Sequence, residues 1–220
     1  MSTVLVIAPH PDDETLGCGG TLLRHRAEGD SIHWLIATRM DPQDGWPAER
    51  IKARAAELDK VQSHYGFASR EEFSLVTTRV DQVPRGELVR AFADAYEKIK
   101  PEIIYLPFDG DAHSDHRHIA EAAVAASKWF RCPTLRQIFV YETLSETGFN
   151  LLAPVFAPNS YVDIAPYLDG KLAAMRLYDG EMGRFPFPRS EEAIRAQAAL
   201  HGSACGKAAA EAFVLLRNIR

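Results

Sequence analysis

Residues 8–14 constrain this chain most, because an apolar run there meets a cluster of ionisable side chains. They read Ala-Pro-His-Pro-Asp-Asp-Glu, follow the apolar residues 4–8, and lead into the small-residue segment 15–20. An apolar run that stops at charged residues and opens into small ones is typical of a buried strand, a loop and a helix start. We therefore expect this loop at the carboxyl end of a strand, where open α/β sheets bind ligands.

A second cluster of the same kind follows the apolar run at residues 103–107. Residues 109–118 read Asp-Gly-Asp-Ala-His-Ser-Asp-His-Arg-His and precede a helical pattern at 119–130. Clustered carboxylates repel one another unless solvent or a cation neutralises them, so a solvated acidic loop is the alternative for either cluster alone. Two such loops at one edge of a parallel sheet favour a metal site over two unrelated surface loops.

The order of the expected elements predicts an α/β fold, a Rossmann-like, mostly parallel sheet between two layers of helices, with the metal site at the carboxyl ends of its strands. Strands are expected at 4–8, 31–38, 73–76, 103–107, 137–142 and 160–164. Helices are expected at 15–29, 49–65, 86–100, 119–130 and 163–178, and over 191–219 with a break near 201–206. No internal repeat or low-complexity linker divides the chain, so residues 1–220 are expected to form one domain.

Composition excludes several classes of function. A net charge of −5 without a basic run argues against nucleic acid as the main partner. No apolar stretch approaches the length of a membrane span. The three cysteines, Cys18, Cys132 and Cys205, are odd in number and widely spaced, which suits reduced thiols in a cytoplasmic protein.

The segments His10-Pro11-Asp12-Asp13-Glu14 and His113-x-Asp115-His116 resemble the signature of the LmbE-like (PIG-L-like) zinc-dependent deacetylases, which act mostly on N-acetylglucosamine units. The resemblance implies that His10, Asp13 and His116 hold Zn²⁺. It also implies that Asp12 is the general base, that a protonated His113 stabilises the oxyanion, and that Asp115 orients His113 and raises its pKa. From the residues alone, either aspartate could be the ligand, and Fe²⁺ or Co²⁺ would accept the same ligands.

Weaker similarities to the same family extend over most of the chain. Arg54 and Glu57 match an Arg-x-x-Glu pattern, which implies that Arg54 binds substrate; the alternative is an exposed ion-pair face. The tail keeps most of a family pattern, including Glu211, but has Ala209 where tyrosine is expected. Other positions are interpreted as follows: Lys171 and Tyr178 resemble family residues, Asp111 matches an acidic position without an assigned role, and His118 is a surface residue. Glu14 is interpreted as a helix cap, with a supporting role at the site as the alternative. Residues 183–189 are interpreted as a surface turn, with contact to an acidic part of the substrate as the alternative.

The predicted function is a zinc-dependent hydrolase that removes the acetyl group from an N-acetylated amino sugar or its conjugate. A zinc amidase on a larger acyl or thiol-conjugate amide, and a non-catalytic sugar- or metal-binding relative, remain as alternatives. The sequence does not identify the sugar or its aglycone. Apolar positions in the C-terminal helices permit a homo-oligomer.

Overall fold

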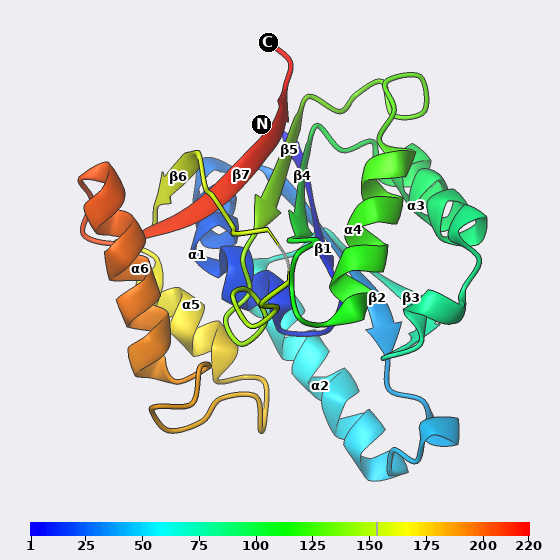
Figure 1. The fold of residues 1–220 in the computed structure, drawn as a ribbon, viewed down its shortest axis with the longest axis horizontal. Coiled ribbons are helices and arrows are strands. Elements are labelled where there is room, and N and C mark those ends of the chain that lie inside the picture. The colour runs from blue at the N-terminus through cyan, green and yellow to red at the C-terminus, as the bar shows by residue number, and fades with distance from the viewer. Residues whose placement is uncertain (153) are drawn as a thin grey trace.

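The computed structural model describes residues 1–152 and 154–220, and in this part of the chain seven strands form one mixed sheet flanked by six helices (Figure 1). The strands are β1 (Thr3–Ala8), β2 (Ser31–Arg39), β3 (Ser69–Val76), β4 (Ile103–Pro107), β5 (Gln137–Tyr141), β6 (Ser160–Asp163) and β7 (Ala210–Asn218). The helices are α1 (Asp13–Glu28), α2 (Ala48–Tyr65), α3 (Arg85–Ile99), α4 (Ser114–Ala126), α5 (Leu168–Met175) and α6 (Glu191–Cys205). Short 3-10 turns lie at Pro42–Asp44 and Val80–Gln82.

The order of the strands brings the two polar loops together. The sheet runs β3-β2-β1-β4-β5-β7-β6, and its first five strands are parallel. β1 pairs directly with β4, with Val4 opposite Ile103. The loops that follow these two strands therefore leave the same edge of the sheet side by side. The predicted α/β fold, with a mostly parallel sheet, is confirmed.

Helices cover both faces of the sheet, which explains why its central strands are apolar without alternation. Val4, Val6 and Ala8 of β1 pack in a core shared with α1, α2, α5 and α6. Leu5 and Ile7 point the other way, into a core shared with α3 and α4. Figure 1 shows α3 and α4 on one side of the sheet and α5 and α6 on the other.

The predicted C-terminal helix over residues 191–219 is wrong in its second half. α6 ends at Cys205 and is capped by Gly206, whose φ of 72° suits glycine; the chain then forms β7. β7 lies between β5 and β6 and is antiparallel to both. Its sequence, Ala-Glu-Ala-Phe-Val-Leu-Leu-Arg-Asn, is compatible with a helix, but pairing with two neighbouring strands decides its conformation.

Other predicted boundaries move by a few residues. α4 begins at Ser114, inside the His/Asp motif, and ends at Ala126 instead of residue 130. The first helix also starts within its motif, at Asp13 instead of residue 15. The helix expected at 163–178 is limited to α5, and β3 is longer than the four residues expected. β6 lies at one edge of the sheet.

A kink at Cys18 bends α1 just beyond the first polar loop; its φ of −142° lies outside the helical range. Glu211 of β7 accepts hydrogen bonds from the backbone N–H groups of Gly20 and Thr21 at 2.9 and 2.7 Å. Lys171 of α5 donates to Glu211 at 2.7 Å and to the carbonyl oxygen of Leu16 at 2.8 Å. The backbone groups around the kink are therefore paired with buried side chains, as such interruptions require.

Cys18, Cys132 and Cys205 are all free thiols. Among the helices that the structure describes, none is both long enough and apolar enough to cross a bilayer.

Candidate metal centre

The two polar loops place all six residues of the predicted catalytic and metal sets at one edge of the sheet. His10 and Asp12 follow β1, and Asp13 is the first residue of α1. His113 caps the start of α4, with His116 in its first turn. Asp12 has a φ of 119°, in a region that non-glycine residues rarely occupy. Such backbone strain is often found at functional sites.

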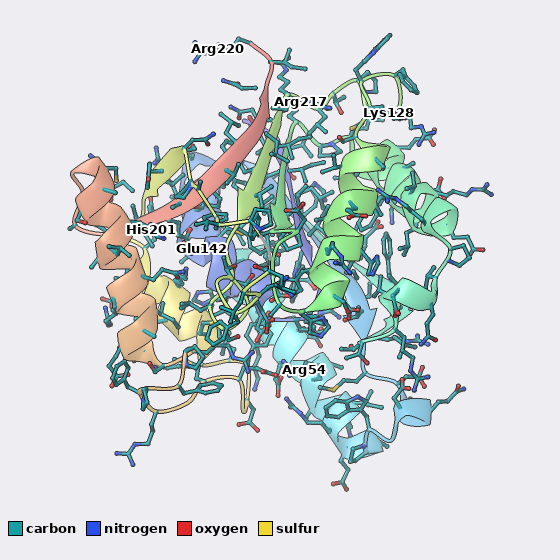
Figure 2. All side chains as sticks on the ribbon, in the orientation of Figure 1. Arg54, Lys128, Glu142, His201, Arg217 and Arg220 are labelled. Atoms are coloured by element: carbon teal, nitrogen blue, oxygen red, sulfur yellow. The ribbon has the colours of Figure 1, made fainter. Side chains whose placement is uncertain are left out.

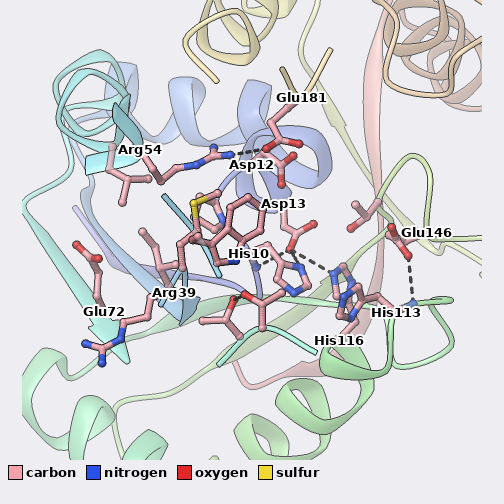
Figure 3. A pocket seen from close by; sticks show the side chains of 18 of the residues that line it. His10, Asp12, Asp13, Arg39, Arg54, Glu72, His113, His116, Glu146 and Glu181 are labelled. Atoms are coloured by element: carbon pink, nitrogen blue, oxygen red, sulfur yellow. Dashed lines mark hydrogen bonds and ion pairs between the residues drawn. The ribbon is translucent and has the colours of Figure 1, made fainter. Parts of the chain in front are cut away.

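His10, Asp13 and His116 form a compact set of ligand atoms (Figure 3). Oδ2 of Asp13 lies 3.3 Å from Nδ1 of His10 and 3.2 Å from Nε2 of His116. The three ligand atoms all lie within 4.8 Å of one another. Two imidazoles and one carboxylate suit a divalent zinc, iron or cobalt ion, and three protein ligands are typical of a catalytic zinc site.

Two further carboxylates hold the outer nitrogens of these histidines. Oδ2 of Asp115 lies 3.1 Å from Nε2 of His10, and Oδ2 of Asp111 lies 2.8 Å from Nδ1 of His116. A hydrogen on each of these nitrogens would be donated to its carboxylate, which leaves the other nitrogen facing Asp13. When the hydrogen is on Nδ1, the buried Nε2 of His116 receives no hydrogen bond from the described residues and faces the carboxylate of Asp13, which is also an acceptor. Ligand histidines are typically held in this way, so the residues fit a metal ion.

The pKa values of the three candidate ligands are shifted because buried histidines and carboxylates lie close together. Burial lowers the pKa of both histidines, but the carboxylates around them outweigh it. Asp115 and Asp13 raise the pKa of His10 to about 9, and Asp13 and Asp111 raise that of His116 to about 10. Burial opposes ionisation of Asp13, yet the two histidines bring the pKa of its carboxyl group below the usual value. Without a metal, the two histidine rings therefore carry extra protons, which a bound cation would displace.

Asp12 lies beside the three candidate ligands and close to an ion pair formed by Arg189 and Glu181. Burial, followed by the negative charge of Asp13, raises the pKa of Asp12 well above its usual value. Nη1 of Arg189 lies 3.8 Å from Oδ2 of Asp12, and Nη2 of Arg189 lies 3.3 Å from Oε2 of Glu181. The interpretation of residues 183–189 as a surface turn is therefore wrong for Arg189, which faces the pocket.

His113 differs from expectation in two respects. Burial and the neighbouring His10 lower its pKa, although Asp115 opposes the shift, so the expected rise in pKa is wrong. The Asp115 carboxylate is closer to His10, at 3.1 Å, than to Nδ1 of His113, at 3.7 Å. The backbone N–H of Asp115 instead donates to Nδ1 of His113 at 3.2 Å. When Nδ1 accepts this bond, the hydrogen of a neutral ring is carried by Nε2.

Arg54 is buried, which rules out the exposed ion-pair face considered for this helix. Its Nη1 lies 3.2 Å from Oε2 of Glu57, and its Nη2 hydrogen-bonds Glu181. Glu57 is also buried and pairs with Arg50 at 2.6 Å. Arg54 lines the same pocket as the metal candidates, and Figure 3 shows it pointing toward Glu181 near Asp12. Figure 2 places Arg54 among all the side chains of the molecule.

The sequence assigned no role at the site to Glu146 or Glu181, and it included Arg189 only in a segment whose alternative role was contact with an acidic part of the substrate. Oε2 of Glu146 accepts a hydrogen bond from the backbone N–H of His113 at 3.1 Å. The only signal for Glu146 was the unusual length of the connection at 143–158, of which residue 153 lies outside the described residues. Glu181 and Arg189 follow α5 along the chain and carried no metal-type spacing.

Glu14 and the remaining family-like positions support α1. Glu14 is fully buried; its Oε2 accepts from the N–H of Asp12 at 3.3 Å, which agrees with a capping role. Its Oε1 accepts from the hydroxyls of Thr15 and Tyr178 at 2.6 and 2.7 Å. His118 is not among the pocket residues.

The metal candidates line a pocket of about 360 Å³. This volume is within the range of small-molecule sites. A mostly parallel α/β sheet with a His/Asp centre at its strand ends defines the class of this protein: an α/β protein with a candidate mononuclear metal site.

Comparison with known proteins identifies the family. Residues 5–127 match the family described as PIG-L: GlcNAc-PI de-N-acetylase, and the chain belongs to this family. A diacetylchitobiose deacetylase of Thermococcus kodakarensis is 25% identical over 233 residues, which cover 98% of this chain and 84% of that protein.

Solved structures share the whole fold. A conserved protein from Thermus thermophilus is 29% identical with a TM-score of 0.80, and the match covers 100% of this chain and 97% of the other. A 4-carboxy-2-hydroxymuconate hydratase from Pseudomonas putida is 17% identical with a TM-score of 0.75, and the match covers 100% of this chain and 98% of the other. The fold alone therefore does not determine the reaction.

Proposed function

We propose that this chain, over residues 1–220 as one domain, is a zinc-dependent deacetylase that removes the acetyl group from an N-acetylated amino sugar or its conjugate. One observation carries the proposal: Asp115 and Asp111 hold the outer nitrogens of His10 and His116, so that both rings face Asp13. Membership in the PIG-L family and the deacetylase among its relatives support the choice of reaction.

In this proposal His10, Asp13 and His116 hold Zn²⁺, and Fe²⁺ or Co²⁺ would suit the same donors. The bound ion would supply an activated water and polarise the acetyl carbonyl. Asp115 and Asp111 keep the ligand rings in place and fix which nitrogen faces inward.

Asp12 is the general base and then the proton donor to the departing amine. Its carboxyl group is adjacent to the ligand set, and its raised pKa suits a group that must both accept and release a proton. His113 lines the same pocket and stabilises the oxyanion. With Nδ1 held by the N–H of Asp115, a neutral His113 donates its Nε2 hydrogen and needs no second proton.

Arg54 belongs to the substrate side of the pocket. Arg54 hydrogen-bonds Glu181, and Glu181 forms an ion pair with Arg189, which lies close to Asp12. These charged side chains offer donors and acceptors for sugar hydroxyls within reach of the reacting amide. A small N-acetylated sugar or glycoconjugate is therefore the proposed partner, and the free thiols suit the cytoplasm. A homo-oligomer stays a prediction.

The test is acetate release from a panel of N-acetylhexosamine conjugates by protein loaded with zinc, iron(II) or cobalt(II). The proposal expects release that a chelator abolishes, that added metal restores, and that Asp12→Asn reduces strongly. Release only from larger acyl or thiol-conjugate amides would favour the amidase alternative. Bound zinc without any acetate release would support the non-catalytic alternative and contradict the proposal.

A further inference from the structure

The pocket has two chemically different ends. Around the metal candidates it is lined by polar residues from the loops after β1 and β4, and by Glu146. At the other end the lining comes from β2, α2 and the segment between them, with Glu72 of β3 and the nearby Thr77. Figure 3 shows Arg39 and Glu72 on the side of the pocket opposite His113 and Glu146. The side chains that line this second end and carry no charge are mainly apolar: Ile36, Met40, Trp46, Ile51, Ala55 and Leu58.

Apart from Arg54, the polar side chains at this end are engaged with other protein groups; Glu72, for example, pairs with Arg70 at 2.8 Å. Oγ1 of Thr38 donates to the carbonyl oxygen of Pro9 at 2.8 Å, and Oγ1 of Thr77 donates to Thr38 at 3.2 Å. Arg39 pairs with Asp41 at 3.2 Å. Sugar hydroxyls placed against the apolar side chains of this end would lose hydrogen bonds to water and gain none from those side chains, which is unfavourable.

Trp46 is the largest side chain of this end. It is 42% exposed, whereas Trp34 of β2 is fully buried. An indole that is left partly open on a pocket wall offers a flat face for stacking, and aromatic contacts contribute beyond the apolar area they bury. Met40 adds a flexible apolar contact from the same segment.

We propose that Trp46, Met40, Ile51 and Ala55 form a subsite for an apolar aglycone, an aryl or alkyl group joined to the amino sugar. The inference rests on the proposed function, which puts the acetamide group at the His/Asp end of the pocket. The aglycone then extends toward α2 and covers the indole. This assigns the substrate to glycoconjugates with an apolar substituent instead of free sugars or oligosaccharides.

Binding of glucosides that carry no amide tests the subsite without turnover. Phenyl and hexyl β-glucosides are titrated calorimetrically into the zinc-loaded wild-type protein, with glucose and cellobiose as polar comparisons. We expect the phenyl or hexyl glucoside to bind at least about tenfold more tightly than cellobiose. Equal or tighter binding of cellobiose, or no binding of any of the four, would overturn the subsite.

Substitutions of Trp46 and Trp129 test whether the preference for apolar glucosides arises at the proposed subsite. Trp46→Ala should reduce the preference for the apolar glucosides to about twofold or less, and Trp46→Phe should keep most of it. The control is Trp129→Ala, because Trp129 is 74% exposed and does not line the pocket. A preference that survives Trp46→Ala, or one that Trp129→Ala removes, would refute the assignment.

Failure of the subsite and failure of the proposed function give different results. Acetate release that is equally fast for free N-acetylglucosamine and for its phenyl and hexyl glycosides would leave deacetylation intact and overturn the subsite. Aglycone binding that depends on Trp46, in a protein that releases no acetate, would support the subsite and contradict the deacetylase.

Discussion

Oδ2 of Asp111 lies 2.8 Å from Nδ1 of His116, and both side chains are fully buried. The carboxylate fixes the ring so that Nε2 faces Asp13. Asp111→Asn should therefore weaken zinc binding by about 10- to 100-fold, the usual effect of losing such an outer partner. Competition with a chelator measures the change. Asp109→Asn is the matched control, because Asp109 is exposed on the same loop, and an equal loss in both variants would contradict the prediction.

His116→Ala should remove the metal and the activity together. His116 contributes one of the three candidate ligand atoms, and two remaining ligands would hold zinc poorly. His118→Ala provides the comparison, since His118 lies on the same helix outside the pocket. Metal analysis after dialysis decides the point, and full zinc occupancy in His116→Ala would refute the ligand assignment.

Asp12→Asn should keep the metal and lower turnover by about 10²- to 10⁴-fold, as expected for the loss of a general base. The amide is similar in size to the carboxylate but cannot take a proton from water. Metal content and acetate release are measured on the same sample. Activity near that of the wild type would exclude Asp12 from the base role.

Zinc binding should release protons and strengthen as the pH rises. At pH 7 the medium is below the pKa of His10, about 9, and that of His116, about 10, so each ring holds an extra proton in the metal-free protein. The metal displaces those protons, and its affinity grows until both groups have titrated. Calorimetry in buffers of different ionisation enthalpy counts the protons. No release at pH 7 would contradict the assigned pKa directions.

Glu211→Ala should destabilise the protein by about 3–5 kcal/mol, the usual penalty for leaving one partner of a buried ion pair alone. The side chains of Lys171 and Glu211 are only 3% and 4% exposed, and Glu211 also holds two N–H groups of α1. Urea denaturation measures the loss. Asp169→Ala, which breaks an ion pair on the surface, should change stability little. Similar effects in the two variants would argue against the buried network.

The sequence predicts most of the candidate centre because its chemistry is local. His10 and Asp13 are three positions apart in the sequence, as are His113 and His116. Each half of the site is therefore a short motif at a strand end. Prediction of the fold succeeds for a related reason, since buried strands of a parallel sheet are apolar runs and helices show a clear period.

What the sequence could not predict depends on contacts between distant residues. β7 was mistaken for a helix because its conformation is imposed by β5 and β6. The rise expected in the pKa of His113 followed from one neighbouring carboxylate, but burial and the approach of His10 reverse it. Arg189 reaches Asp12 from a distant segment of the chain, and no local pattern marks that contact.

The bond between Glu211 and the kinked helix α1 has a consequence for synthesis on the ribosome. All three proposed metal ligands lie at or before residue 116, yet the strand that holds α1, the helix that begins at Asp13, starts only at Ala210. A nascent chain would thus carry the ligands long before α1 is held in place, and the domain would mature late, in a single step. We expect a ribosome-bound chain that lacks β7 to hold zinc weakly, and a chain extended through β7 to hold it as the folded domain does.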